Sequence, residues 1–382
     1  MSPTPGYGRA INRIVVEGYK SIREVDLRLG GLTVLIGANG AGKSNFIDAL
    51  ELLGRIADED LQLEVGLRGG AQSLLHSGAR PATEISLRME AESGPEMNAY
   101  LVQLVAAAND EMIIGNEQIF FHDKTRYAEP WNSVIGRGSR ETKLGEAVRL
   151  LPGSGVARLA TELLRGCRVY HFQDTSRQAP VKSLGLASDN VTLAPDAGNL
   201  AAFLMRLRDS DPGSYQQIVR TIHAVAPFFR DFLLAEEHSG RVRLRWRQVG
   251  SDTVFPAEAF SDGTLRFICL ATLLLQPDPP ALLVLDEPEL GLHPFAIKVL
   301  ANLLRTASEH SQVFLATQSV TLLDQFTIDE LVVAQRSDDG ATELIRPAQD
   351  ELAEWLDAYS LGELWLKNIL GGRPDQPSRA DD

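Results

Sequence analysis

Eight consecutive residues, Gly37 to Ser44, match the pattern Gly-x-x-x-x-Gly-Lys-Ser/Thr at every position. Glycines in such a loop let backbone N–H groups turn toward a phosphate, where a Cβ atom would collide. Lys43 can then reach the terminal phosphates, and the Ser44 hydroxyl can bind Mg²⁺. The pattern therefore predicts a phosphate-binding loop (Walker A). Its expected nucleotide-binding residues are Gly37, Asn39, Gly40, Gly42, Lys43, Ser44 and Asn45.

An acidic pair follows an apolar run far downstream, where Leu282-Leu-Val-Leu precedes Asp286 and Glu287. A carboxylate at the end of a buried strand can hold Mg²⁺, and the next residue can take a proton from water that attacks a γ-phosphate. We expect Ser44 and Asp286 as metal ligands, Glu287 as the catalytic base, and ATP with Mg²⁺ as cofactors. Lys43 and Asp286 lie 243 positions apart, which indicates an inserted region and opposes a minimal P-loop kinase.

A third motif, Phe260-Ser-Asp-Gly-Thr264, begins a helical pattern 25 positions before the acidic pair. Ser261 is a typical N-cap, and the helix start with Gly263 offers free N–H groups to an anion. Here the sequence resembles the ABC-type ATPases, whose signature is Leu-Ser-Gly-Gly-Gln. Ser261 and Gly263 match that signature, whereas Phe260, Asp262 and Thr264 depart from it. Taken alone, such a turn is most often only a helix cap.

Other segments of the sequence resemble a narrower group within the ABC-type ATPases. Gly18-Tyr-Lys-Ser-Ile22, Leu32 to Gly37 and Asp286 to Pro294 look like stand-alone RecF-like and OLD-like ATPases, which are related to RecF and SMC heads. The resemblance extends over about residues 10–372. In that family two heads close around two ATP molecules, so the resemblance implies a homodimer. Ser261 and Gly263 of one head would touch the γ-phosphate held by the other.

Two glutamines complete the expected site. Val313 to Ser319 matches the switch strand, and Gln318 stands where many relatives have His. A Gln side chain can orient water or phosphate by hydrogen bonds but cannot carry a proton at neutral pH. We therefore expect Gln318 in the catalytic site together with slow turnover. Gln173 is the expected Q-loop residue that contacts nucleotide and Mg²⁺, and the alternative is a polar loop residue.

These motifs predict an α/β fold, namely a P-loop NTPase with an ABC-ATPase head, an N-terminal antiparallel β-subdomain and an inserted β-rich and helical region. The expected elements are strands within 11–37 and 82–122, a helix from Gly42 to Gly54, loops at 130–139 and 152–155, helices at 156–165 and 214–226, and a strand from Arg241 to Arg247. We expect one head over 10–372, with lobes 10–170 and 171–372, and a disordered tail over 373–382.

The composition narrows the class of protein. The formal net charge is −14, which opposes non-specific binding to DNA or acidic membranes. Two cysteines without a CxxC motif exclude a disulfide framework or a zinc finger and predict two buried thiols. The first residues show no signal-peptide pattern, and no apolar run approaches the length of a membrane helix. A cytoplasmic protein without a membrane partner is the expectation.

One segment could face a polyanion. Arg241-Val-Arg-Leu-Arg-Trp-Arg247 places four arginines on one strand face, where they could contact phosphates. The alternative is a solvated face whose arginines pair with Asp or Glu on neighbouring strands, and the charge of −14 favours that alternative.

The resemblance implies an ATPase in DNA repair or genome maintenance, with double-stranded DNA as a partner. An alternative is the ATPase switch of a phage-defence system that holds a protein effector. The ATP-binding subunit of a transporter is a further alternative, opposed by the long stretch between Ser44 and Ser261. Only 63 residues follow Ser319, too few for the nuclease domain of OLD proteins.

Overall fold

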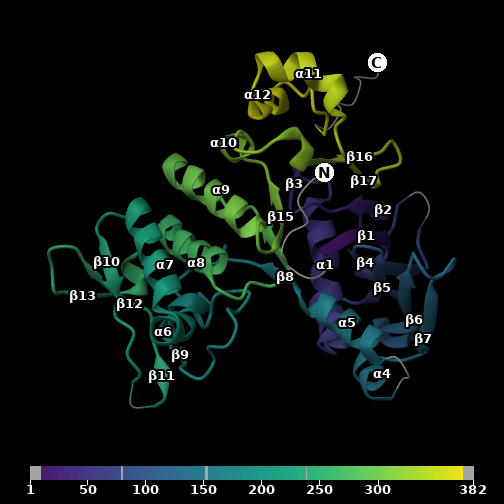
Figure 1. Cartoon of the computed structure of the whole chain (residues 1–382), viewed down its shortest axis with the longest axis horizontal. Helices are drawn as coiled ribbons and strands as arrows, with labels where there is room; N and C mark the ends of the chain where they lie inside the picture. Colours follow the sequence, from purple (N-terminus) through teal and green to yellow (C-terminus); the bar gives the residue numbers. More distant parts are fainter. Residues whose placement is uncertain (1–9, 79–80, 151–153, 238, 373–382) are drawn as a thin grey trace.

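Two six-stranded sheets form the framework of the computed structural model, which describes residues 10–78, 81–150, 154–237 and 239–372 (Figure 1). One sheet is antiparallel with the order β2-β1-β4-β5-β6-β7, and the other has the order β17-β16-β3-β15-β14-β8. Their strands are β1 (Ala10–Tyr19), β2 (Ile22–Arg28), β3 (Leu32–Gly37), β4 (Glu84–Ser93), β5 (Glu96–Ala106), β6 (Met112–Asp123), β7 (Trp131–Gly136), β8 (Cys167–Tyr170), β14 (Leu282–Asp286), β15 (Gln312–Thr317), β16 (Leu331–Arg336) and β17 (Thr342–Ile345).

Twelve helices occur among the described residues. They are α1 (Lys43–Ala57), α2 (Leu61–Leu67), α3 (Ala71–Leu74), α4 (Leu144–Leu150), α5 (Ser154–Arg165), α6 (Leu200–Ser210), α7 (Pro212–Val225), α8 (Asp262–Leu275), α9 (Pro294–Ser308), α10 (Val320–Leu323), α11 (Gln349–Ala358) and α12 (Leu361–Leu366). Short strands β9 (Gly185–Leu186), β10 (Phe229–Phe232), β11 (Arg241–Val242), β12 (Arg245–Gln248) and β13 (Val254–Pro256) form two small sheets.

The second large sheet is parallel except for β17, and its central strands are apolar without alternation because both faces are covered. Leu35, Val284 and Phe314 pack with α1 and the antiparallel sheet in one hydrophobic cluster. Their chain neighbours Val34 and Leu283 face the opposite side, in the cluster that contains α8 and α9. The sheet therefore joins two cores, and the P-loop helix lies between the two large sheets (Figure 1).

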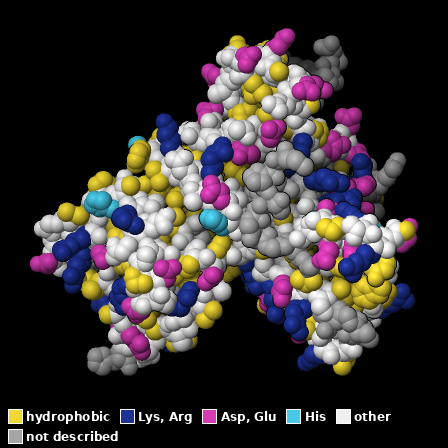
Figure 2. Space-filling view, viewed as in Figure 1, with side chains coloured by type: hydrophobic (Ala, Val, Ile, Leu, Met, Phe, Trp, Pro, Cys, Tyr) yellow, Lys and Arg dark blue, Asp and Glu magenta, His cyan; other side chains and the backbone are white. Residues whose placement is uncertain are grey.

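Surface charge is unevenly placed. Asp and Glu side chains gather over α11 and α12, whereas Lys and Arg gather at the far end formed by β12 and β13 (Figure 2). Acidic side chains therefore gather over the carboxyl-terminal helices, and basic side chains gather over β12 and β13 and on other parts of this face (Figure 2).

Gln312, at the start of β15, ties the two large sheets together. Its side chain accepts from the Ile11 backbone N–H at 2.6 Å and donates to the Ile11 and Gly30 carbonyls at 2.8 and 3.1 Å. The residue is 2% exposed, so water cannot replace these hydrogen bonds.

The α/β fold and the antiparallel subdomain are confirmed, and most expected elements are present. Three expectations about elements are wrong. The helix after Gly42 does not end at Gly54 but continues to Ala57, and a Cβ on Gly54 would approach the Cys167 carbonyl within 2.9 Å. This glycine serves close packing on β8. The segment 130–139 contains β7, and the strand expected from Arg241 to Arg247 is interrupted at 243–244 between β11 and β12.

Both cysteines are buried, as expected. The expected tail at 373–382 and the amino-terminal residues 1–9 lie outside the described residues, as do residues 152 and 153 of the loop expected at 152–155. Residues 154 and 155 of that loop belong instead to α5. The boundary between lobes at residue 170 stays a prediction. None of the helices in the described ranges combines the length and the hydropathy that a bilayer span requires.

We expect Gln312→Leu to lower the free energy of unfolding by about 2–4 kcal/mol, because it leaves buried backbone groups without partners. Urea denaturation measures this loss. Gln325→Leu is the control, since that side chain makes one long hydrogen bond of 3.4 Å. Equal stability of the two variants would contradict the assigned role of Gln312.

Candidate functional site

The loop between β3 and α1 lies at the carboxyl edge of the parallel sheet. Gly42 has φ 104°, and a Cβ there would lie 1.9 Å from the Thr342 hydroxyl, so only glycine fits. The Lys43 ammonium group is folded back onto the loop and donates to the carbonyls of Gly37 and Ala38 at 2.7 and 3.1 Å. Burial lowers the pKa of Lys43, and an anion in the loop would compensate that burial.

The expected metal ligands meet. The Ser44 hydroxyl donates to a carboxylate oxygen of Asp286 at 3.1 Å, although the two residues are 242 positions apart. Burial raises the pKa of Asp286, opposed by the Ser44 hydrogen bond and increased by the charge of Glu287. A cation bound here would remove that penalty.

Glu287 follows in a strained conformation, with φ 46°. Its backbone N–H donates to the Ala316 carbonyl at 2.8 Å, which fixes the residue against β15. The Gln318 amide donates to Glu287 Oε1 at 2.5 Å. The two expected catalytic side chains are therefore in direct contact. The second carboxylate oxygen of Glu287 can accept a hydrogen bond from a further donor.

A cavity of about 180 Å³ gathers most of the expected site. It is lined by Asn39, Gly40, Gly42, Lys43, Ser44, Asn45, Glu287, Gln318 and Arg336. Two open cavities of about 480 and 680 Å³ flank it, and both share Arg336 with it. The Arg336 guanidinium donates to the Gly40 carbonyl at 2.8 Å. Arg336 is not part of any sequence motif. It reaches the loop only because β16 pairs in parallel with β3.

The other expected residues lie around this cavity. The Gln173 amide donates to the backbone carbonyl of Asp286 at 3.2 Å, beside the acidic motif. Ser261 caps α8 through the Thr264 N–H at 3.2 Å, as expected for an N-cap. Neither Ser261 nor Gly263 lines the cavity of its own chain. A Cβ on Gly263 would lie 2.4 Å from the Gly291 carbonyl, so this glycine also permits close packing on the segment after the acidic motif.

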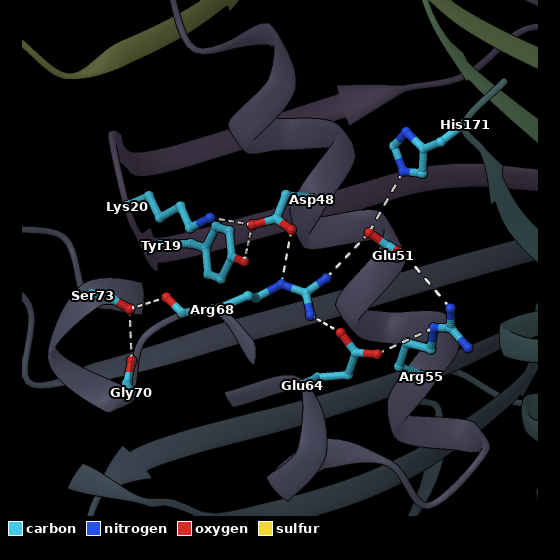
Figure 3. A network of polar contacts seen from close by, with 10 residues as sticks. All are labelled: Tyr19, Lys20, Asp48, Glu51, Arg55, Glu64, Arg68, Gly70, Ser73 and His171. Carbon is cyan, nitrogen blue, oxygen red and sulfur yellow. Dashed lines mark hydrogen bonds and ion pairs between the residues drawn. The ribbon is translucent and has the colours of Figure 1, made fainter. Parts of the chain in front are cut away.

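A charged network runs along α1 from the site toward the antiparallel sheet (Figure 3). Arg68 is its centre and binds the carboxylates of Asp48 at 2.8 Å, Glu51 at 3.2 Å and Glu64. His171 continues it from the end of β8, with 3.8 Å between its Nε2 atom and a Glu51 oxygen. The neighbouring Glu51 carboxylate raises the pKa of His171, against the effect of burial.

Glu289 is a further residue that the motif did not single out. It is 8% exposed and accepts a hydrogen bond from the Thr317 hydroxyl. The same hydroxyl oxygen accepts from the Ser319 N–H at 2.9 Å, so it fixes the turn that carries Gln318. Burial raises the pKa of Glu289. The sequence shows only a Glu after a proline. The role of Glu289 in holding the turn is therefore visible only in its tertiary contact with Thr317.

The donor set fits Mg²⁺ in the presence of phosphates. The described part of the chain holds no cluster of three or more His, Cys, Asp or Glu side chains that could bind a metal alone. Mg²⁺ usually takes one or two protein oxygens and completes its shell with water and substrate phosphates. Ser44 and Asp286 supply such a pair.

Comparison with known proteins agrees with this geometry. A family model described as "AAA domain, putative AbiEii toxin, Type IV TA system" matches residues 32–140 and 174–324, well over half of the chain. A urease accessory protein 2 of Cryptococcus neoformans var. grubii is 36% identical over 83 residues, which are 21% of this chain and 6% of that protein. The chain thus spans only a small part of this relative.

Solved structures share the fold. An Smc head bound to the C-terminal winged-helix domain of ScpA is 16% identical, with a TM-score of 0.62 over 90% of this chain and 99% of that chain. The Smc head with an extended coiled coil from Pyrococcus furiosus is 14% identical, with a TM-score of 0.56 over 91% and 99%. The fold is that of SMC-head P-loop ATPases, as the sequence motifs predicted.

We expect Thr317→Val to lower kcat for ATP hydrolysis about tenfold at nearly unchanged KM, because one to two hydrogen bonds that hold the Gln318 turn are lost. Thr317→Ser keeps the hydroxyl and should act like wild type. Steady-state kinetics of both variants tests this. If the Val variant matched the Ser variant in kcat, Thr317 would not position Gln318.

Proposed function

The chain belongs to the AAA domain family of AbiEii type, and from this premise we propose that it is an ATP-hydrolysing homodimer gated by ATP, acting in DNA repair or genome maintenance. The observation that carries the hydrolytic part is the meeting of Ser44, Asp286, Glu287 and Gln318 beside the phosphate loop. These residues come from three distant motifs, which lie at the carboxyl ends of β3, β14 and β15.

Each side chain has a defined task in this proposal. The loop amides and Lys43 bind the phosphates, and Lys43 exchanges its two carbonyl acceptors for phosphate oxygens. Ser44 and Asp286 would hold Mg²⁺, which neutralises charge on the phosphates when bound. Glu287 takes the proton of the attacking water through the oxygen that Gln318 leaves free. Gln318 fixes the rotamer of Glu287 and supplies no proton.

The proposed dimer rests on the position of Ser261 and Gly263, which do not line the cavity of their own chain. Ser261 is exposed at the start of α8, away from its own phosphate loop. Leu290 and Phe295, on the segment packed against that helix start, are 46% and 53% exposed. A second copy that covers this apolar surface would present Ser261 and Gly263 to the nucleotide across the interface.

A second candidate is an ATP-driven switch that holds a protein effector. The family description names a toxin of a TA system, and an SMC head of the same fold was solved with the winged-helix domain of ScpA. An ATP-dependent pull-down of a protein would favour this candidate. An ATP- and salt-sensitive shift of duplex DNA would favour genome maintenance.

We expect Glu287→Gln to reduce ATP hydrolysis by about 10²–10⁴-fold, because the amide cannot accept the water proton. The Gln318 hydrogen bond is kept in this variant, so ATP binding should persist and the dimer should accumulate. Phosphate release and light scattering measure the two effects.

Glu309→Gln is the matched control, since Glu309 is exposed at the far end of α9. Wild-type hydrolysis by Glu287→Gln would show that another group is the base. If ATP left the mass of both variants at that of one chain, the shared site between two copies would be wrong.

A further inference from the structure

Four arginines at alternate positions lie on β11, on β12 and between these two short strands, which belong to two small sheets at the end of the molecule. Their alternate neighbours Val242, Leu244 and Trp246 are at most 3% exposed, so the arginines project from the opposite side. We call them the arginine row: Arg241, Arg243, Arg245 and Arg247. Figure 2 shows Lys and Arg side chains gathered at this end, over β12 and β13.

The row has almost no internal counter-ions. The ion pair found for it in the described chain joins Arg245 to Glu237, at the long distance of 4.0 Å. The Nε atoms of Arg243, Arg245 and Arg247 are buried without a hydrogen-bond partner among the described residues. A ligand outside the chain cannot reach these buried Nε atoms, so it would have to bind the terminal nitrogens of the guanidinium groups. The pairing with neighbouring acids that the charge of −14 favoured is present for Arg245, and for the other three arginines it stays a prediction.

The matching ligand is a line of phosphates. A guanidinium group can bind two phosphate oxygens at once, and alternate residues of an extended chain recur about every 6.6–6.8 Å. The aromatic side chains of this sheet lie behind it, where Trp246 contacts Phe228 and Phe229. Single-stranded nucleic acids need aromatic platforms on the binding face, so this face suits a duplex backbone.

The back of the row is joined to the signature motif. Trp246 stacks on Phe255 and Phe260, with ring centroids 4.9 and 4.4 Å apart and ring planes within 27° and 15° of parallel. Its indole N–H donates to the Pro256 carbonyl at 3.1 Å. Phe260 directly precedes Ser261, the cap of α8. Trp246 lies between Arg245 and Arg247 in the chain, so its contact with Phe260 joins the arginine row to the signature motif.

We propose that the arginine row binds the phosphate backbone of double-stranded DNA and that the stacked pair Trp246–Phe260 transmits this binding to Ser261. The inference deepens the proposed function, on which its ATP-dependent part rests. The row positions DNA without reading bases, because phosphate contacts carry no direct sequence information. Trp246 is a positioning residue that touches neither nucleotide nor DNA.

The first experiment measures binding of a 40-base-pair duplex to the full chain without ATP, over a series of salt concentrations. The triple variant R241Q/R243Q/R247Q removes the three arginines for which the described residues provide no ion pair. Each lost phosphate contact should reduce the slope of log K against log salt by about 0.9, so the slope should fall by up to about 2.7. The control R137Q/R149Q/R158Q removes three exposed arginines elsewhere and should keep the wild-type slope.

Three outcomes overturn the binding surface. The wild-type chain does not bind the duplex at low salt, or the row variant keeps the wild-type slope. The third outcome is row-dependent binding of poly-glutamate without binding of the duplex, which would assign the row to an acidic protein. Basal ATP hydrolysis, measured without DNA, reports the proposed function separately, so loss of one leaves the other standing.

The second experiment tests transmission. Duplex DNA should raise ATP hydrolysis several-fold in wild type and in Trp246→Phe, which keeps an aromatic ring. Trp246→Leu should bind DNA with the wild-type slope and keep basal hydrolysis but lose the stimulation. Full stimulation in Trp246→Leu overturns the aromatic link. The Phe variant keeps the test valid if the Leu variant does not fold.

Discussion

The contact between Ser44 and Asp286 is the constraint on which the rest of the site depends. It joins a loop after β3 to the end of β14, and β15 lies between these strands. Three parallel strands must therefore align in register before the first acid meets the phosphate loop. The carboxyl ends of parallel strands share one edge, and this geometry turns distant motifs into one site.

The end of β14 and the short segment after it place three carboxylates in three different environments. Asp286 lies beside Ser44, Glu287 is held by Gln318, and Glu289 is buried against Thr317. The same segment continues to Gly291, whose carbonyl lies against the signature helix. Any movement of this segment must therefore shift the proposed base, the switch turn and the signature together.

Local chemistry explains how much of this could be predicted from sequence. The phosphate loop, the acidic pair, the switch strand and the cap at Ser261 are each encoded within a few residues, and the structure brings the first three together. Arg336 and His171 could not be found this way, because only pairing between strands places them near the site. Gly54 has the residue type of a helix end, but its role is to allow the close approach of Cys167, a tertiary contact that the sequence does not show. The alternation of arginines is visible in the sequence, but the long distance of the Arg245–Glu237 ion pair is known only from the structure.

We propose above all that backbone amides and Lys43 bind a nucleoside triphosphate at this edge of the sheet. Calorimetric titration of ATP with Mg²⁺ into the pure protein, beside the variant Lys43→Ala, tests it most directly. The account predicts saturable heat with one ATP per chain in wild type and none in the variant at equal thermal stability. Absence of heat in wild type, or identical curves for both proteins, would contradict it.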